Sequence, residues 1–318
     1  MLDYDIFKKI ICSELKNRLS KDDLLVELKV SDANTINNTK KDKLSVINPS
    51  QPDAYPIFYL NDIYKYYNAC GDMYATVNDV ANEIRRTFSN MPVLNVSRDI
   101  VEHNVYYSLV NFDQNRELLQ HIPHRNFYDL AITYRVELTD TSDFLVTNKV
   151  MDDIGLTEND LYMSACKNTP AILGEVCCMK LDDWYINELK AVINNTINYK
   201  DSESQEKESE PIYVFKFQNS NEYGSSVILY GDVLEKAADK INDDLVMMFP
   251  NSDELMVTST KCSNERLDEL FGGYRIPVEK FLSNKKYLYN RHTKKVSIRS
   301  TCDVSLDNVA DRRQNKSR

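Results

Sequence analysis

The clearest pattern of hydrophobic and polar positions in this chain lies between residues 104 and 151. Residues 104–112 predict a strand, which a short helix and a corner containing Pro123 separate from a second strand. Apolar residues at every second position indicate this second strand: Leu130, Ile132, Tyr134 and Val136. The period is typical of a strand with one buried face, so we expect the two strands to form the centre of the core.

The first third of the chain alternates between patterned segments and one long polar segment. The predicted elements are, in order, an amphipathic helix over residues 1–19, a strand over 24–30, a polar Asn-rich loop over 31–53 and a tyrosine-rich helix after an apolar entry over 55–67. Thr76 and Asp79 have the spacing of a capping box, in which each side chain satisfies the other's backbone amide. They predict the start of a helix over residues 76–88.

The middle of the chain continues from the second strand into a return strand and helices. A polar turn over residues 139–143 precedes the apolar run Phe-Leu-Val-Thr, which is consistent with an antiparallel return. We then expect a short helix over 149–154 and a helix that starts at a second capping box, Thr157 with Asp160. Pro170 predicts that a new helix starts there, and we expect this longer helix to run through Cys177.

The last third predicts strands and two helices. The strands are expected over residues 212–218, 225–231, 244–250 and 254–260 and in a hairpin over 285–300; the helices are expected from Asp232, with Glu235 completing a capping box, and over 264–273, with Ser263 as the cap.

The pattern as a whole indicates an α+β fold with mostly antiparallel sheets, flanking helices and two sequential subdomains. Residues 1–54 form an N-terminal segment of helix, strand and Asn-rich loop, and residues 55–200 form an α+β core subdomain. Residues 201–210, five acids and one lysine without an apolar residue, predict a linker or loop. A second α+β subdomain over 211–300 and a flexible tail over 301–318 complete the chain.

Net charge and cysteine usage limit the classes of partner and the cellular compartment that we expect. Lys and Arg number 39 against 49 Asp and Glu, a net charge of -10, and a surface of that sign repels phosphates, so we expect no nucleic-acid partner. Seven cysteines without a C-x-x-C spacing indicate neither a disulfide framework nor a four-thiolate zinc site, which favours a reducing cytoplasm. No run approaches the roughly 18 apolar residues of a membrane span, so we expect no membrane partner.

Common catalytic and cofactor motifs are absent from the sequence. The seven glycines form neither G-x-G-x-x-G nor G-x-x-x-x-G-K-[ST], the loops in which glycine allows the backbone to approach a phosphate closely. G-x-S-x-G and H-E-x-x-H are absent as well. We therefore predict no cofactor and lean towards a protein that is not an enzyme.

One short segment holds the candidate catalytic residues, His121, His124 and Asp129. Two imidazoles three residues apart with a carboxylate close behind could bind a metal or form an acid-base pair, which makes His121 and His124 the candidate metal ligands as well. Pro123 breaks a helical presentation of the two rings, and we predict no metal site. The alternative is structural: Arg125 and His124 hydrogen-bond the corner, and Asp129 caps or pairs nearby.

Several segments, in the same order, resemble a known family. They include YYSLVNFDQNRELLQHIPHRNFYDLAITYRV, FLVTNKVMDDIGLTENDLY and GSSVILYGDVLEKAADKINDDLVMMFPNSDELMV. Together with YPIFYLNDIYKYY and VEKFLSNKKYLYNRHTKKVSI they cover most of residues 55–299 and resemble the bacterial domain of unknown function 5688. The resemblance implies a cytosolic bacterial protein of Gram-positive type and no catalytic residue. Gly231 stands where the family usually has proline.

Three functions remain open. The first is a non-enzymatic interaction or regulatory protein with a protein partner, favoured by the missing nucleotide motifs and the acidic, tyrosine-rich composition. The second is a metal-assisted or acid-base hydrolase at the corner of His121 and His124. The third is an acidic nucleic-acid mimic that binds a basic protein.

Overall fold

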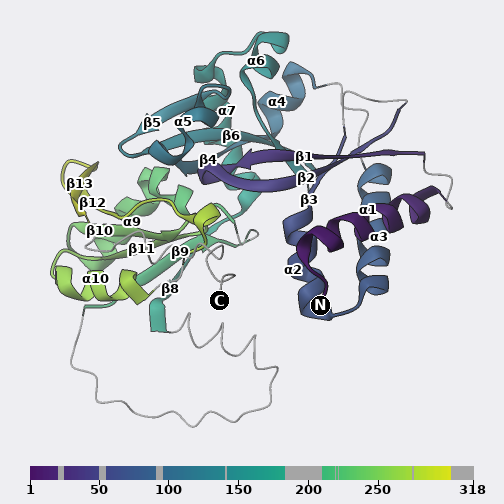
Figure 1. The fold of residues 1–318 in the computed structure, drawn as a ribbon. Helices are drawn as coiled ribbons and strands as arrows, with labels where there is room; N and C mark the ends of the chain where they lie inside the picture. The colour runs from purple at the N-terminus through teal and green to yellow at the C-terminus, as the bar shows by residue number, and fades with distance from the viewer. Residues whose placement is uncertain are drawn as a thin grey trace. The chain divides into compact units, whose positions relative to one another are not determined.

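The computed structural model describes residues 1–20, 25–49, 55–90, 96–139, 142–182, 210–218, 220, 222–273 and 276–301 (Figure 1). The chain divides into two compact units, Met1–Val96 and Ser97–Arg318, which we call unit 1 and unit 2. Both combine helices with antiparallel sheets, which confirms the predicted α+β class. No helix in the described ranges is long and apolar enough to cross a membrane.

Unit 1 combines helices with a three-stranded antiparallel sheet of order β1-β2-β3. Its described elements are α1 (Tyr4–Ser20), β1 (Glu27–Thr35), the 3-10 helix η1 (Ile36–Asn38), β2 (Thr39–Ile47), β3 (Ile57–Tyr59), α2 (Leu60–Cys70) and α3 (Met73–Asn90).

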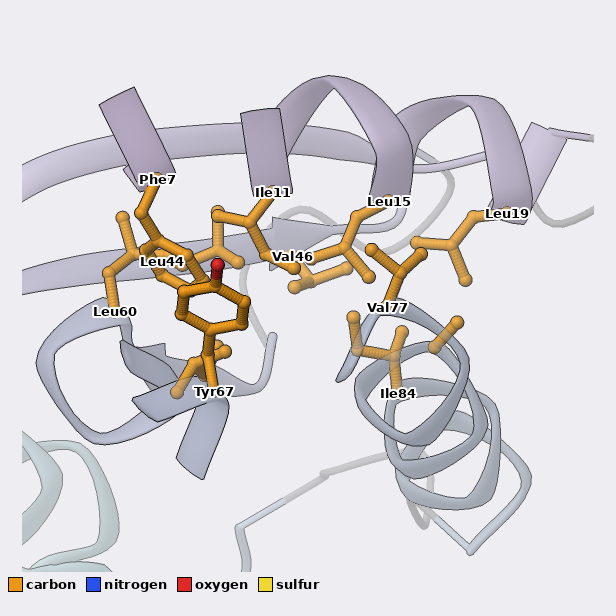
Figure 2. Packing of buried hydrophobic residues seen from close by; sticks show 12 residues of the cluster. Phe7, Ile11, Leu15, Leu19, Leu44, Val46, Leu60, Tyr67, Val77 and Ile84 are labelled. Carbon is orange, nitrogen blue, oxygen red and sulfur yellow. The ribbon is translucent and has the colours of Figure 1, made fainter. Parts of the chain in front are cut away.

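The core of unit 1 forms where α1 packs on the sheet and on the two following helices (Figure 2). The buried residues of α1 recur every fourth position, as one face of a helix requires: Phe7, Ile11, Leu15 and Leu19. They pack with Leu44 and Val46 of β2, and the rings of Phe7 and Tyr67 stack with centroids 5.3 Å apart. This burial confirms the amphipathic helix predicted at the N-terminus.

The same core explains why the unit boundary differs from the expected one. We expected a boundary after residue 54, but the division lies between Val96 and Ser97. The buried residues Tyr67 of α2 and Ile84 of α3 belong to the cluster that α1 forms. Hydrophobic burial therefore ties the N-terminal segment to the two helices that follow it.

The Asn-rich segment forms a β-hairpin, so the predicted loop is wrong. β1 pairs with β2 in register from Glu27 opposite Ile47 to Thr35 opposite Thr39. Asn37 and Asn38 make the turn at φ values of 59° and 53°, in the left-handed region that asparagine tolerates better than most residues. The polar composition that indicated a loop thus includes the turn residues of the hairpin.

The capping box predicted at Thr76 and Asp79 is also wrong, because α3 begins at Met73. Thr76 is buried inside the helix, and its hydroxyl donates to the Asp72 carbonyl at 2.7 Å. Asp79 instead accepts a hydrogen bond from the Tyr66 hydroxyl at 2.5 Å.

The first half of unit 2 contains a four-stranded antiparallel sheet. Its described elements are α4 (Arg98–Asn104), β4 (Val105–Asn111), the 3-10 helix η2 (Asp113–Asn115), α5 (Arg116–Leu119), β5 (His124–Phe127), β6 (Leu130–Thr139), β7 (Ser142–Leu145), α6 (Asn148–Ile154) and α7 (Glu158–Leu173).

Strand β6 is the centre of this sheet, as the sequence predicts. It pairs with β4 along one edge and with β5 and then β7 along the other, which confirms the antiparallel return. The predicted buried positions, from Leu130 to Val136, are buried. Ala131 and Thr133 are buried too, so this part of β6 is covered on both faces and the expected half-buried strand is wrong.

Helix α7 closes the free edge of β4. The Asn168 side chain donates to the Val105 carbonyl at 3.2 Å, and the Thr169 hydroxyl accepts from the Tyr107 amide at 3.3 Å. These bonds satisfy backbone groups that an edge strand leaves without a strand partner. The capping box at the start of α7, Thr157 with Asp160, is confirmed.

The predicted helix start at Pro170 is wrong, because α7 continues through this proline to Leu173. Proline removes a hydrogen bond inside a helix and clashes with the preceding turn. Thr169 and Leu173, on either side of Pro170, are both buried. Their packing offsets that cost and keeps the last turn helical.

The second half of unit 2 contains a six-stranded antiparallel sheet of order β13-β12-β10-β11-β9-β8. Its described elements are β8 (Val176–Lys180), β9 (Tyr213–Phe217), the 3-10 helix η3 (Gly224–Leu229), α9 (Gly231–Ile241), β10 (Leu245–Asn251), β11 (Glu254–Ser259), α10 (Asn264–Gly273), the 3-10 helix η4 (Val278–Lys280), β12 (Lys285–Asn290) and β13 (Lys295–Thr301).

Most of the elements predicted here are confirmed, and three expectations are wrong. The strand expected over residues 225–231 is η3, whose residues from Gly224 to Ile228 are buried. The helix expected through Cys177 is β8, because this cysteine pairs with Lys216 of β9. No capping box starts α9, since Tyr230 precedes the helix without a side-chain cap. The Ser263 cap of α10 is confirmed by its bond with the Arg266 amide at 3.3 Å.

The predicted acidic linker falls, except for Glu210, outside the described residues, and the predicted tail does so except for Thr301. The strands on either side of the acidic segment pair with each other, from Val176 opposite Phe217 to Lys180 opposite Tyr213. The described strands before and after the segment therefore belong to one sheet.

We expect Leu15→Ala to lower the free energy of unfolding of unit 1 by about 2–5 kcal/mol, because it leaves a cavity in a fully buried cluster. Native-state hydrogen exchange at the amides of α1 and α3 measures this loss of protection. The matched control is Glu14→Ala, an exposed position of the same helix, where we expect a change within about 0.5 kcal/mol. Equal protection in the two variants would contradict the packing in Figure 2.

Candidate functional site

The two candidate histidines lie in the turn and strand that follow α5. His121 is exposed in the turn, and its carbonyl accepts from the Asn148 amide at 3.0 Å. His124 is the first residue of β5 and half-buried. Its Nδ1 lies 3.2 Å from the Ile122 carbonyl, and its ring centroid lies 6.2 Å from that of Phe112. His124 thus contacts its own corner through its ring, whereas His121 contributes its backbone carbonyl.

Asp129 joins the two sheets of unit 2. It lies in the turn between β5 and β6, where one carboxylate oxygen accepts from the Ser283 hydroxyl at 2.7 Å and the other accepts from the Tyr287 hydroxyl of β12. The ring of Phe127 stacks on that of Tyr287 with centroids 6.4 Å apart. Burial, reinforced by Asp129, raises the pKa of Tyr287, so its hydroxyl keeps the proton that it donates.

His121, His124 and Asp129 contact different partners in the structure. Asp129 binds residues of the second sheet, whereas the ring of His124 faces the Ile122 carbonyl and Phe112. Among the described residues, no group of three or more His, Cys, Asp or Glu side chains is placed to hold a metal ion. The catalytic and metal assignments at His121 and His124 stay predictions.

A cleft of about 400 Å³ lies at the opposite end of β6. Its lining comes from three parts of unit 2: the strands β4, β6 and β7, the C-terminal end of α7 and the loop that precedes η3. The cleft thus lies where segments of the four-stranded sheet meet the loop that follows β9. We call it the Arg135 cleft, after the cation in its wall.

An ion pair between β6 and β7 forms the polar wall of the Arg135 cleft. The Arg135 guanidinium donates to both oxygens of Asp143, at 2.9 Å from Nε and 2.5 Å from a terminal nitrogen. The Tyr106 hydroxyl of β4 donates to the same carboxylate. Side-chain exposures of 17% for Arg135 and 22% for Asp143 show that the pair is largely withdrawn from water. A paired and hydrogen-bonded arrangement is what makes such burial tolerable.

Burial and charge together determine the protonation states of the side chains in this wall. Burial alone would raise the pKa of the Asp143 carboxyl, but the hydrogen bonds and charge of Arg135 hold it below its usual range. Burial likewise opposes the charge of Arg135, yet Asp143 raises the pKa of the guanidinium. Burial raises the pKa of Tyr106, and it raises that of Tyr223 to about 12. At neutral pH the wall holds one carboxylate, one guanidinium and two protonated phenols.

Tyr223, in the loop before η3, contacts this wall. Its backbone conformation is costly. Its φ of 64° lies in the left-handed region, which costs a non-glycine residue about 1–2 kcal/mol. Its ring centroid lies 5.7 Å from that of Tyr106 and 5.8 Å from the Arg135 guanidinium carbon. Next in the chain, Gly224 approaches the Asp253 carbonyl so closely that a Cβ would lie 2.0 Å from the oxygen. The loop is held by both contacts.

The sequence contained a signal for the hairpin that carries the ion pair but none for the loop. In the β6–β7 hairpin, Glu137 pairs with Asp143 and Arg135 with Leu145, so Arg135 and Asp143 are diagonal neighbours on one face. The predicted turn over residues 139–143 includes Asp143, whereas β7 begins at Ser142, so the antiparallel return was predicted but its register was not. Tyr223 reaches the cleft from a segment that was expected to be near a strand, and no local pattern indicates its contact with Arg135.

We expect Asp129→Ala to lower the free energy of unfolding of unit 2 by about 2–4 kcal/mol, because it removes two hydrogen bonds to a carboxylate and leaves the buried Tyr287 hydroxyl without its acceptor. Denaturant unfolding followed by circular dichroism measures the loss. The control is Asp113→Ala, which removes an exposed ion pair with Arg116 and costs at most about 1 kcal/mol. Equal stability of the two variants would argue against the structural role of Asp129.

The Arg135–Asp143 pair also predicts an acid dependence. The pKa of Asp143 is lower in the folded chain than its unfolded value of about 3.9, so between the two values the unfolded chain binds more protons. The stabilisation is therefore complete above the unfolded pKa and is lost as pH falls through the folded pKa. We expect Asp143→Asn to lose less unfolding free energy than wild type between about pH 5 and about pH 2. Parallel pH profiles in urea denaturation would contradict this.

The comparisons with known proteins identify a family but no individual relative. No curated protein and no solved structure matches the chain. The family described as "Family of unknown function (DUF5688)" matches residues 4–291. The match begins where α1 begins and ends just after β12, so it includes the residues of the Arg135 cleft and the corner of His121 and His124. It also agrees with the resemblance seen in the sequence segments. The chain belongs to the DUF5688 family.

Proposed function

We propose that this protein is a non-enzymatic interaction or regulatory protein that binds its ligand in the Arg135 cleft. The observation that supports this most directly is the fixed protonation of the polar wall. A general acid or base works best when its pKa lies near the working pH. Asp143 and Arg135 have pKa values displaced away from neutrality in opposite directions, and the pKa of Tyr223 is raised to about 12. Such groups recognise a ligand by charge and hydrogen bonds without exchanging protons with it.

The position of the cleft supports a regulatory role. A ligand bound there contacts β6 and β7 of one sheet together with the loop of Tyr223, which leads through η3 to α9. Any preference of the ligand for one arrangement of these segments shifts the population of that arrangement. Binding is thereby able to change the surface that unit 2 presents to a protein partner.

We place this role in the cytoplasm, with a protein as the partner. The cysteine usage supports that compartment, because the six cysteines in the described ranges are free thiols. The acidic net charge supports a protein partner over a nucleic acid. Neither the hydrolase at His121 and His124 nor the nucleic-acid mimic gains a supporting contact in the described parts of the chain.

The test is to expose the full chain to a defined panel of amino acids, polyamines, nucleotides, sugars and sugar phosphates. Hydrogen-exchange mass spectrometry reports protection of residues 104–112, 135–145 and 222–230, and proton NMR of the same samples reports whether any compound is converted. We expect at least one compound to protect these segments while every compound stays intact.

The control for this panel is Arg135→Met, which removes the cation of the ion pair while keeping a long side chain. We expect it to lose the protection. The proposal fails if no compound protects the three segments. It also fails if a compound is consumed at a rate that falls in Asp143→Asn, because the cleft would then be catalytic.

A further inference from the structure

The free edge of the sheet in unit 1 indicates a contact between two copies of this chain. Strand β1 lies at the end of the order β1-β2-β3, and among the described residues it pairs only with β2. We propose that residues 26–30 pair in antiparallel fashion with the same residues of a second copy. This segment belongs to unit 1, so the inference does not depend on the Arg135 cleft, whose described residues belong to unit 2.

Strand β1 lacks several features that protect edge strands in other proteins. It runs for nine residues, Glu27–Thr35, and its register with β2 has no shift. It contains neither proline nor glycine. An edge strand that is short, bulged or interrupted by proline resists pairing with another chain, whereas a long and regular one presents a row of backbone groups for such pairing. The edge of β1 is therefore suited to accept a further strand.

The hydrogen bonds of β2 show which residues of β1 direct their backbone groups to the free edge. The Val46 amide donates to the Pro56 carbonyl at 3.1 Å, so Val46 directs its backbone groups away from β1. Leu28 lies opposite Val46. Directly opposite residues of an antiparallel pair either exchange both of their hydrogen bonds or exchange none, and the two cases alternate along the strand. Leu28 and Val30 therefore direct their N–H and C=O groups to the free edge, and Val26 precedes Leu28 by the same interval.

Residues 26–30 are complementary to themselves. Their sequence is Val-Glu-Leu-Lys-Val. An antiparallel pair of this segment with its copy, centred on Leu28, places valine opposite valine and leucine opposite leucine. It also places Glu27 of each copy opposite Lys29 of the other, and opposite charges across two strands attract. A contact between identical copies with two-fold symmetry requires this kind of match.

The neighbouring registers lose this match. A pair centred on Glu27 or on Lys29 places that residue opposite its own copy, and like charges directly opposite each other are destabilising. A pair centred on Val30 places the apolar Leu28 opposite the charged Asp32. Of these four registers, only the one centred on Leu28 satisfies both charge and hydrophobicity.

The side chains of the segment offer an apolar surface on one face and charges on the other. Val26 and Leu28 are half-buried and pack against the core of unit 1, whereas Val30 is 46% exposed. These residues share a face because they are two positions apart, and the exposed Glu27 and Lys29 lie on the opposite face. In the proposed pair, the apolar residues of the two copies meet along the edge. Their burial favours association.

The first test is sedimentation equilibrium of the full chain over a concentration series from about 1 to about 100 μM. We expect the mass to rise from the 36.9 kDa of one chain to twice that value. Residue-resolved hydrogen exchange of the same samples reports on the edge. We expect the amides of Leu28 and Val30 to gain protection as the dimer forms, because they then donate to the second copy.

A proline variant tests the edge. Val30→Pro removes an amide hydrogen that the pair needs and that β2 does not use. We expect it to weaken the dimer about tenfold or more, because symmetry removes the hydrogen bond twice. The control is Asn34→Pro, an exposed position that faces the same edge outside residues 26–30 and whose dimer we expect within about twofold of wild type. Circular dichroism confirms that both variants are folded.

Charge reversal tests the register. Glu27→Lys places a lysine opposite Lys29 of the second copy, and Lys29→Glu places a glutamate opposite Glu27. We expect each variant alone to dimerise about tenfold more weakly than wild type. A mixture of the two variants again places opposite charges at both positions. We expect the mixed dimer to form with an affinity within about threefold of wild type.

Three results overturn the inference. One is the mass of a single chain throughout the concentration series. The second is a dimer that Val30→Pro leaves unchanged, because the contact then lies elsewhere. The third is a mixture of the two charge variants that dimerises no better than either variant alone. None of these results alters the ligand-induced protection that tests the Arg135 cleft, so failure of this inference is separate from failure of the proposed function.

Discussion

The pairing of β6 along both of its edges is the constraint on which the rest of unit 2 depends. β4 occupies one edge, and β5 and β7 share the other in succession. The hairpin to β5 therefore turns at one end of β6, at Asp129, and the hairpin to β7 turns at the other end, beside Asp143. A strand of ten residues separates these ends by roughly 33 Å. One end joins the two sheets and the other borders the Arg135 cleft.

This arrangement explains why the partners of Asp129 could not be predicted from the sequence. Asp129 has the chemistry of a catalytic base, but its two oxygens are engaged by Ser283 and Tyr287, residues more than 150 positions later. Those partners are far away in the sequence and invisible to a local pattern. The ion pair of Arg135 and Asp143 is different, because a hairpin with a short turn places the two on one face. The hairpin was predicted from the sequence, whereas its register and the burial of the pair beside Tyr223 were not.

The same distinction separates the elements that the sequence predicts correctly from those that it does not. The helix α1 follows from its periodic apolar positions, and the strands β4, β6, β10 and β11 follow from short apolar runs; both patterns are local. The β1–β2 hairpin was missed because its composition is polar and its two turn asparagines look like those of a loop. η3 was missed because a buried apolar run fits a strand as well as a helix, and its packing decides between them.

Under the proposed function, the ion pair in the cleft serves recognition more than stability. Withdrawing two charges from water costs about as much as their attraction returns, so an apolar pair in the same place often stabilises a fold as well. Here the pair also keeps Tyr106 as a donor to Asp143 and holds the ring of Tyr223 near the guanidinium. Its effect is to give the wall one fixed pattern of charges and hydrogen bonds, which is what a selective binding site requires.

The polar wall contacts the loop of Tyr223, whose backbone conformation is costly. Under the proposed function, this contact allows ligand binding to favour one conformation of unit 2. The left-handed Tyr223 costs about 1–2 kcal/mol, a cost that the loop contacts offset. A ligand present at a hundred times its dissociation constant stabilises the state that binds it by about 2.7 kcal/mol. Under the proposed function, a ligand that binds only while the loop lies on the wall therefore favours that arrangement. The loop continues through Gly224 into η3, whose buried residues pack against β4, β9 and β11, so its state affects both sheets.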